Sequence, residues 1–233
     1  MKVLQLSGYE YVLPLLVLLL IPSALPAQRR SGAPTIVTHY CSGCHEVDGK
    51  SQLSYIPRLA GQNAAYVLRK LQTFRAADSS PVDEFTRVVR FENPAGADIR
   101  ITRAASIHMV GVARAVSEAD KKAAAEWYAA QTPAAGRSGR RELIEEGRDL
   151  FINGLQAKGL TACQDCHGPD AKGNDHAPRL AGQNATYLMN QLALYKESDP
   201  HHSPEMSIVA RSVEGAQARA VAAYLQSLGS TSH

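Results

Sequence analysis

The octapeptide PRLAGQNA at residues 57–64 recurs without change at residues 178–185. Each copy follows a run in which two cysteines, two residues apart, are followed at once by histidine: CSGCH at 41–45 and CQDCH at 163–167. Eight identical residues beside a matched cysteine and histidine pattern are too many for chance. The sequence therefore predicts two copies of one domain in tandem.

Both copies are predicted to be helical. Apolar residues recur after each octapeptide with the i, i+4, i+7 spacing of a helix face, as Val67, Leu71 and Phe74 and again as Leu188, Leu192 and Tyr195. Asn63 and Asn184 are expected to be the N-caps of these helices, and Ser117 the N-cap of a helix over 118–130. Further helices are expected over 143–151 and 215–228. No segment shows the period-two alternation of a strand, so the predicted fold class is all-α.

The domain boundaries follow from the repeat and from composition. The first domain is expected over 28–132 and the second over 141–233. Proline, glycine and serine in the residues between them, 133–140, are typical of a linker. The first copy is the longer one, and its extra residues within about 76–101 are expected to form a surface loop.

Residues 1–27 resemble an export signal. An apolar run over 11–25 is shorter than the roughly 20 residues that span a membrane. It is followed by Pro26-Ala27, and we expect cleavage after Ala27, with an uncleaved anchor as the alternative. Either outcome places the rest of the chain outside the cytoplasm.

The formal charge is +3 and is unevenly distributed. Residues 28–135 hold 14 Lys and Arg against 10 Asp and Glu, whereas residues 136–233 hold 10 against 11. This difference could orient protein docking. No basic cluster is dense enough to predict nucleic-acid binding.

All four cysteines belong to the two C-x-x-C-H runs, which are the attachment signature of c-type haem. Two thiols on one helical turn can reach both vinyl groups of one porphyrin. The histidine that follows can then bind the iron from the same side. The predicted cofactors are two covalently attached haem c groups, bound through Cys41, Cys44, Cys163 and Cys166.

Three other interpretations of the cysteines explain less. Thioredoxin-like C-x-x-C motifs accompany a βαβ pattern, which is absent from this sequence. The ligands of a zinc site usually come from a shorter span. A structural disulfide within each motif would leave both histidines without a role.

The sixth iron ligand in cytochromes c is a methionine. Met109 and Met206 occupy matching positions just upstream of the last helix of their copies. Met189 lies within an amphipathic helix and is expected to belong to the hydrophobic core. The competing histidines are His108, His201 and His202, which have no counterpart in the other copy and are expected at the surface. His39 and His176 are also unmatched. Ligation by two histidines on at least one haem remains the alternative.

From about Gly32 to Leu228 the sequence resembles the dihaem class I cytochromes of the cytochrome c4 family. The resemblance rests on the doubled C-x-x-C-H, the doubled P-R-L-A-G-Q, the tyrosine after each, and the methionine before each last helix. It implies two cytochrome c domains with their haems near the face between them. It also implies periplasmic electron transfer, loose membrane association, and His45 and His167 as proximal ligands opposite Met109 and Met206. Pro57 and Pro178 would offer carbonyls to those histidines. The side chains expected to contact haem propionates are Arg58, Arg179, Gln62, Gln183, Tyr66 and Tyr187.

Three functions are compatible with this site. A free carrier would move single electrons from a redox protein donor, such as a dehydrogenase or cytochrome complex, towards a terminal oxidase or similar acceptor. Alternatively, the chain would be the cytochrome subunit of such a complex. A dihaem redox enzyme would need one exchangeable haem ligand, and no cysteine remains to supply a thiolate.

Overall fold

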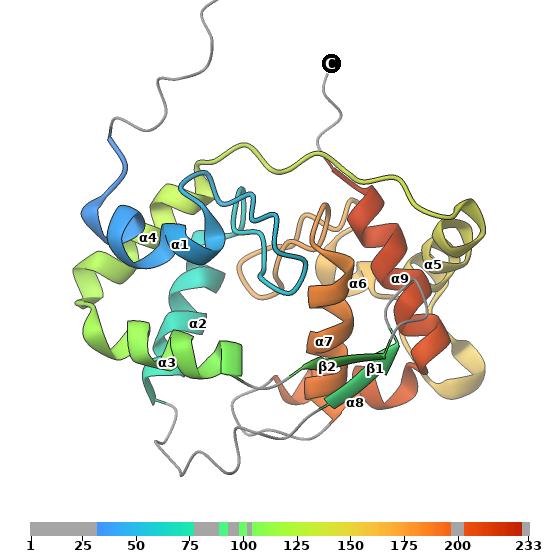
Figure 1. Ribbon diagram of the computed structural model, residues 1–233. Helices are drawn as coiled ribbons and strands as arrows, with labels where there is room; N and C mark the ends of the chain where they lie inside the picture. The colour runs from blue at the N-terminus through green and yellow to red at the C-terminus, as the bar shows by residue number, and fades with distance from the viewer. Residues whose placement is uncertain (1–31, 77–88, 93–97, 102–103, 197–202, 230–233) are drawn as a thin grey trace, which may run out of the picture.

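The structure is a computed structural model that describes residues 32–76, 89–92, 98–101, 104–196 and 203–229. Two helical halves lie side by side and are joined by a segment that runs over the top of the molecule in Figure 1. The signal segment expected over 1–27 lies outside the described residues. Among the helices of the described part, none is long and apolar enough to cross a membrane.

The first half begins with a short π-helix that runs into its cysteine motif, and three longer helices follow. They are η2 (Val37–Cys41), α1 (Ser42–His45), α2 (Ala64–Ala76), α3 (Ala104–Ala115) and α4 (Glu118–Ala129). Helix α2 packs against both α3 and α4. The predicted cap of α4 is confirmed, because Ser117 and Asp120 form a reciprocal capping box.

The second half begins with a full helix before its cysteine motif. Its elements are α5 (Arg141–Asn153), η4 (Gln156–Lys158), α6 (Gln164–His167), α7 (Ala185–Lys196), α8 (Pro204–Ser212) and α9 (Gly215–Ser227). Helices α5 and α9 cross closely at Gly147, where an added Cβ would lie 2.0 Å from the Ala220 carbonyl oxygen. Next to this crossing the rings of Phe151 and Tyr224 pack with their centroids 5.5 Å apart.

The two cores differ in continuity. The second half has one cluster of buried residues, which includes Phe151, Leu188 and the predicted core residue Met189. The described residues of the first half form two smaller clusters, one around Ile36 and Val37 and the other around α2. The helix stripe that was predicted from Val67 and Leu71 is confirmed, since both are buried.

The residues inserted in the first half are not only a loop. They contain two antiparallel strands, β1 (Val89–Glu92) and β2 (Asp98–Ile101), paired from Val89 opposite Ile101 to Glu92 opposite Asp98. Strand β1 lies against α7 of the second half (Figure 1). The expectation of no strand was wrong here: both strands alternate apolar and polar residues, but only over four residues, which is the shortest length at which this pattern indicates a strand. Val89 and Phe91 in β1, and Ile99 and Ile101 in β2, are residue types that favour strands.

One of the two predicted asparagine caps is also wrong. Asn63 Oδ1 accepts a hydrogen bond from the Tyr66 amide at 3.1 Å, so Asn63 caps α2 as expected. Asn184 Oδ1 has no hydrogen-bond partner. Its amide group instead donates to the carbonyls of Leu53 and Ile56 in the other half, at 3.1 and 2.9 Å. This use across the two halves overrides the local capping role.

Candidate haem-binding site

Each C-x-x-C-H histidine is buried and held by a proline carbonyl. His45 Nδ1 lies 3.0 Å from the Pro57 carbonyl oxygen, and His167 Nδ1 lies 2.9 Å from that of Pro178. The two imidazoles are only 7% and 6% exposed. A carbonyl only accepts, so Nδ1 carries the proton and Nε2 keeps its lone pair for a metal.

Burial lowers the pKa of both imidazoles, against the opposing effect of the proline hydrogen bond. The neutral form is therefore favoured at neutral pH. It is also the form that binds a metal.

A sharp turn follows each histidine and brings the proline loop back to it. The turn residue is Glu46 at φ 64° and ψ 161° in the first half and Gly168 at φ 77° and ψ 158° in the second. This backbone region is essentially restricted to glycine. In the first half it is held by α4, where Tyr128 Oη donates to the Glu46 carbonyl at 3.0 Å and Trp127 Nε1 to the Val47 carbonyl at 2.7 Å.

The first cysteine of each motif is half-buried and the second is exposed. Burial raises the pKa of both Cys41 and Cys163 to about 11. Reactive or metal-binding cysteines have a lowered pKa instead, because the thiolate is the nucleophile and the ligand. These two cysteines are therefore poorly suited to thioredoxin-like exchange.

The geometry gives no support to the disulfide and zinc interpretations. None of the four cysteines, all of which lie within the described residues, is paired in a disulfide. The described part of the chain also holds no group of three or more His, Cys, Asp or Glu side chains that could bind a metal ion.

The two candidate distal methionines occupy corresponding helices. Met109 lies in α3 and packs, half-buried, against the cluster of Val67, Leu71 and Ala113. Met206 lies in the first turn of α8, where its amide is capped by Ser203 Oγ at 3.3 Å. Their ligand role stays a prediction.

The described histidines outside the motifs lie at the surface. His39, His108 and His176 are exposed, and the surface position expected for His108 is thereby confirmed. His201 and His202 lie outside the described residues.

Three buried side-chain atoms within the described residues lack a hydrogen-bond partner: Arg179 Nε, Asn184 Oδ1 and Asn190 Oδ1. A buried, unpaired guanidinium nitrogen is costly, and a carboxylate is its natural partner. The propionates of a haem would supply such carboxylates. The available imidazole lone pairs, the thiols and this orphaned donor together fit a covalently bound haem.

The glutamines predicted to contact propionates lie between the halves and bind them together. Gln183 Oε1 accepts from the Arg58 amide at 2.8 Å, and Gln183 Nε2 donates to the Arg58 carbonyl at 3.0 Å. Gln62 does the same to the Arg179 amide and carbonyl, at 2.8 and 3.0 Å. We call these two reciprocal pairs the glutamine clamps.

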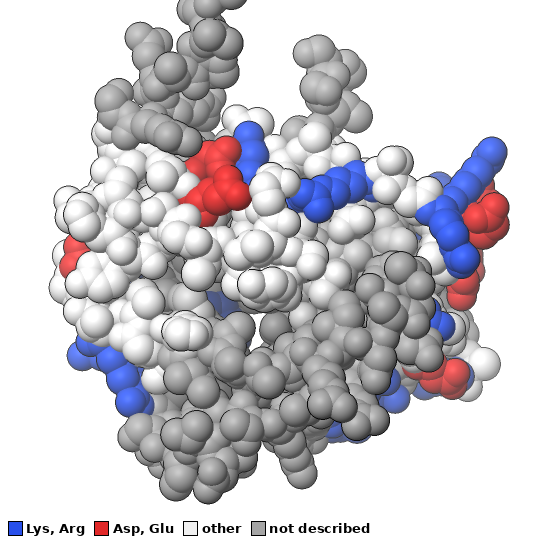
Figure 2. All heavy atoms as spheres, viewed as in Figure 1, with Lys and Arg blue, Asp and Glu red and all other residues white. Residues whose placement is uncertain are grey.

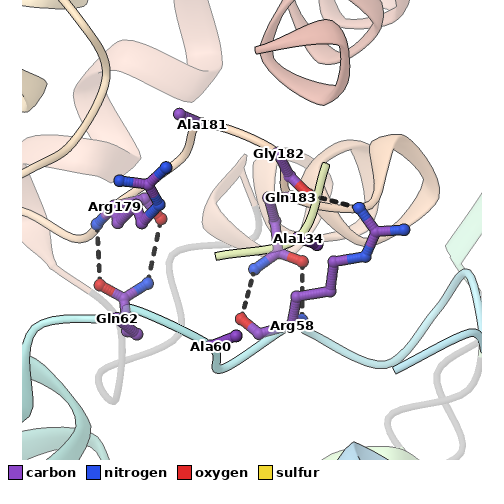
Figure 3. A pocket seen from close by; sticks show the side chains of 8 residues that line it. All are labelled: Arg58, Ala60, Gln62, Ala134, Arg179, Ala181, Gly182 and Gln183. Carbon is purple, nitrogen blue, oxygen red and sulfur yellow. Dashed lines mark hydrogen bonds between the residues drawn. The ribbon is translucent and has the colours of Figure 1, made fainter. Parts of the chain in front are cut away.

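The clamps surround a small pocket between the halves (Figure 3). Its lining residues are Arg58, Ala60, Gln62, Ala134, Arg179, Ala181, Gly182 and Gln183. Arg58 Nη1 donates to the Gly182 carbonyl at 2.7 Å, whereas the buried Arg179 Nε has no such partner. The two equivalent arginines therefore differ in how they are satisfied.

Tyr66 and Tyr187 lie near each other at the boundary between the halves. Burial raises the pKa of Tyr66 well above its usual range, and the neighbouring Tyr187 and Tyr195 raise it further. Burial likewise raises the pKa of Tyr187. Both phenols therefore stay protonated, and their contact with propionates stays a prediction.

Sequence reasoning assigned Arg58, Gln62 and their repeats to the cofactor and missed their contacts across the halves. One signal was available. If each copy binds the other through the same residues, those residues must occur in both copies. The octapeptide meets this requirement, because its eight residues are identical in the two copies.

The described surface shows no large area of one charge on the face drawn in Figure 2. Acidic and basic side chains occur there in small groups that lie near one another.

The family described as Cytochrome c matches residues 144–229. Over most of its length the chain is similar to three curated proteins. It is 32% identical to cytochrome c-552 of Acidithiobacillus ferridurans, covering 88% of this chain and 81% of the relative. It is 30% identical to cytochrome c4 of Stutzerimonas stutzeri, covering 81% and 84%. It is also 30% identical to the thiosulfate dehydrogenase electron acceptor of Stutzerimonas stutzeri strain A1501, covering 81% and 79%.

The fold is shared with solved structures. Reduced recombinant cytochrome c4 from Pseudomonas stutzeri superposes with a TM-score of 0.66 at 29% identity. The match covers 82% of this chain and 94% of that one. The predicted fold of two tandem cytochrome c domains is thereby confirmed.

Proposed function

The chain belongs to the cytochrome c4 family of dihaem c-type cytochromes, and on this premise we propose that it is a periplasmic carrier of single electrons in a respiratory chain. The observation that carries the proposal is the pair of buried imidazoles, each oriented by a proline carbonyl with its Nε2 left for iron. The carrier would accept electrons from one redox protein and deliver them to a terminal oxidase or a similar acceptor. Loose association with the membrane surface is part of the proposal.

We assign the ligands by position. Cys41 and Cys44 would hold the first haem through thioethers, and Cys163 and Cys166 the second. His45 and Met109 would be the axial ligands of the first iron, and His167 and Met206 those of the second. Haem supplies a one-electron redox centre whose potential depends on axial ligands, burial and nearby hydrogen bonds.

The protein's own residues would fix that chemistry in three ways. The carbonyls of Pro57 and Pro178 orient the imidazoles and raise their basicity by accepting a hydrogen bond from Nδ1–H. The buried clusters around α2 and α7 exclude water from the site. Arg179, with its unpaired buried Nε, is suited to bind a propionate carboxylate.

We propose a carrier and not an enzyme, because methionine and histidine together would leave neither iron with an open position for a substrate. A high-spin haem, or one that binds carbon monoxide in the reduced protein, would contradict this proposal.

A second candidate is favoured by one comparison. A relative that is 30% identical over most of its length is described as a thiosulfate dehydrogenase electron acceptor. The chain would then serve as the electron-accepting cytochrome partner or subunit of a dehydrogenase that oxidises a small sulfur compound. Rapid reduction by such a dehydrogenase, at a rate well above that with an unrelated reductase, would favour this role.

The first test is the intact mass of the exported protein. We expect the polypeptide plus two haems, with the N-terminus after Ala27. The bare polypeptide, or a mass with one haem, would refute the cofactor assignment.

The second test addresses the distal ligands. Met109→Ala and Met206→Ala should each remove the methionine-to-iron absorption of one haem and lower its potential, because methionine ligation raises it. If either variant leaves both haems unchanged, that methionine is not a ligand.

A further inference from the structure

One peptide group connects each imidazole to the opposite half of the molecule. The carbonyl of Pro57 accepts from His45 Nδ1 at 3.0 Å. The amide N–H of Arg58 belongs to the same peptide group and donates to Gln183 Oε1 at 2.8 Å. The peptide group is planar and rigid, so the position of its N–H fixes the direction of its carbonyl.

The second half repeats this connection in the reverse direction. The carbonyl of Pro178 accepts from His167 Nδ1 at 2.9 Å, and the amide of Arg179 donates to Gln62 Oε1 at 2.8 Å. In both directions the glutamine also donates to the carbonyl of the same arginine. The arginine backbone is therefore held on both sides.

Other hydrogen bonds fix the same loops from across the boundary. The loop before Pro57 is held by Asn184, which donates to the carbonyls of Leu53 and Ile56, and by the Tyr187 amide, which donates to that of Ser54 at 3.1 Å. The loop before Pro178 is held by Asn63 Nδ2, which donates to Asp175 Oδ1 at 2.9 Å. Neither loop is positioned by its own half alone.

From these contacts we infer that Gln183 is a positioning residue for His45, and Gln62 for His167, so that each half tunes the redox centre of the other. The inference rests on the proposed function, because the imidazoles must be iron ligands for the tuning to have an effect. The chain of hydrogen bonds runs from glutamine to peptide to imidazole, and bonds in such chains polarise one another.

The sign of the effect follows from this polarisation. A peptide N–H that donates to glutamine makes its carbonyl a better acceptor. A stronger bond at Nδ1 makes the imidazole a more basic ligand, which favours oxidised iron. Removing the glutamine should therefore raise the potential of the haem in the opposite half.

The test is the variant Gln183→Met in the full-length dihaem protein, with Gln62→Met as its mirror image. Methionine keeps the side-chain length and removes both hydrogen bonds. Two quantities are measured in each protein: the midpoint potential of each haem, and the Nδ1–H proton resonances of His45 and His167 in the reduced state. The resonances assign each effect to one half without relying on the distal ligands.

We expect Gln183→Met to raise the potential of the first-half haem more than that of the other, and to shift the His45 proton upfield. Gln62→Met should do the same to the second-half haem and to His167. Unchanged potentials, a fall, or a larger effect within the variant's own half would overturn the inference. If one variant does not fold, its mirror image tests the same claim.

Gln52→Met is the matched control. Gln52 Oε1 accepts from Arg137 Nη2 at 2.7 Å, which joins the same loop to the linker without involving the Pro57–Arg58 peptide. It should leave both readouts unchanged, and a shift as large as that of Gln183→Met would overturn the inference. If the wild-type protein binds two haems and the glutamine variants show no crossed effect, this inference alone is refuted. If the wild-type protein binds no haem, the proposed function is refuted.

Discussion

The two halves place their imidazoles in the same way on different scaffolds. In the second half, α5 crosses α9 at Gly147 and one continuous core extends to α7. In the first half the chain enters its motif through the short π-helix η2, and the described core is divided into two clusters. The histidine, its proline carbonyl and the glutamine clamp are nevertheless present in both. The common part of the repeat is therefore the ligand loop and its contact with the other copy.

The turn after the histidine shows the same contrast at one residue. The second half places Gly168 in a backbone region that suits glycine, whereas the first half places Glu46 there. Hydrogen bonds from Trp127 and Tyr128 stabilise the strained turn. The first half thus uses α4 side chains where the second uses glycine.

The largest expected effect tests whether the halves load their cofactors independently. Cys41→Ala with Cys44→Ala should remove one haem, and Cys163→Ala with Cys166→Ala the other. Each double variant should keep the spectrum of the remaining haem. Intact mass and the absorption spectrum measure both results. Loss of both haems from either double variant would show that the halves cannot form separately.

The next effect tests the close crossing that distinguishes the second half. Gly147→Ala should lower the free energy of unfolding by about 1–3 kcal/mol, because the new Cβ would collide with the backbone of α9. Gly111→Ala, in an open position of α3, is the matched control and should raise it by about 0.5–1 kcal/mol. Denaturant unfolding measures both, and equal changes would mean that the crossing is not tight.

A smaller effect tests the strained turn. Glu46→Gly should stabilise the first half by about 1 kcal/mol, since relief of strain exceeds the entropy cost of glycine. Gly168→Glu should destabilise the second half by a comparable amount. The midpoints of thermal unfolding report both changes. A neutral Gly168→Glu would indicate that the turn carries no strain in either half.

The smallest effect concerns pH. The pKa of Glu118 is lowered by hydrogen bonds from Lys121, in the same helix, and from Arg75, which joins α2 to α4. A lowered carboxyl pKa contributes stability above its ordinary value of 4.5, and this stability is lost as the pH falls through the folded-state pKa. Glu118→Gln should therefore reduce the loss of first-half stability on acidification. An unchanged acid limb in unfolding measurements would contradict this.

Much of this arrangement could be predicted from local patterns. Local patterns predict the amphipathic stripes and the cap at Ser117, which depend on residues within a few positions of one another. Alignment of the two copies predicts the core position of Met189 and the surface position of His108. They were therefore accessible without knowledge of the contacts between halves.

The errors share a physical cause, which is contact between distant segments. Asn184 is of a residue type that commonly caps helices, but its side-chain amide donates hydrogen bonds to the carbonyls of Leu53 and Ile56 in the other half. Strand β1 of the insertion lies beside α7, which is far along the chain. Gln62 and Gln183 sit beside the ligand loops, yet their partners are 117 and 125 residues away. Local sequence gives no measure of such pairings.

The glutamine clamps have a consequence for the origin of the molecule. A surface that binds another copy of itself through the same residues is what a symmetric homodimer of a single-haem ancestor would present. Joining two such genes would need only a connecting segment of the right reach, because the mating surface would already exist. Retention of the octapeptide in both copies is what such a fusion would leave behind.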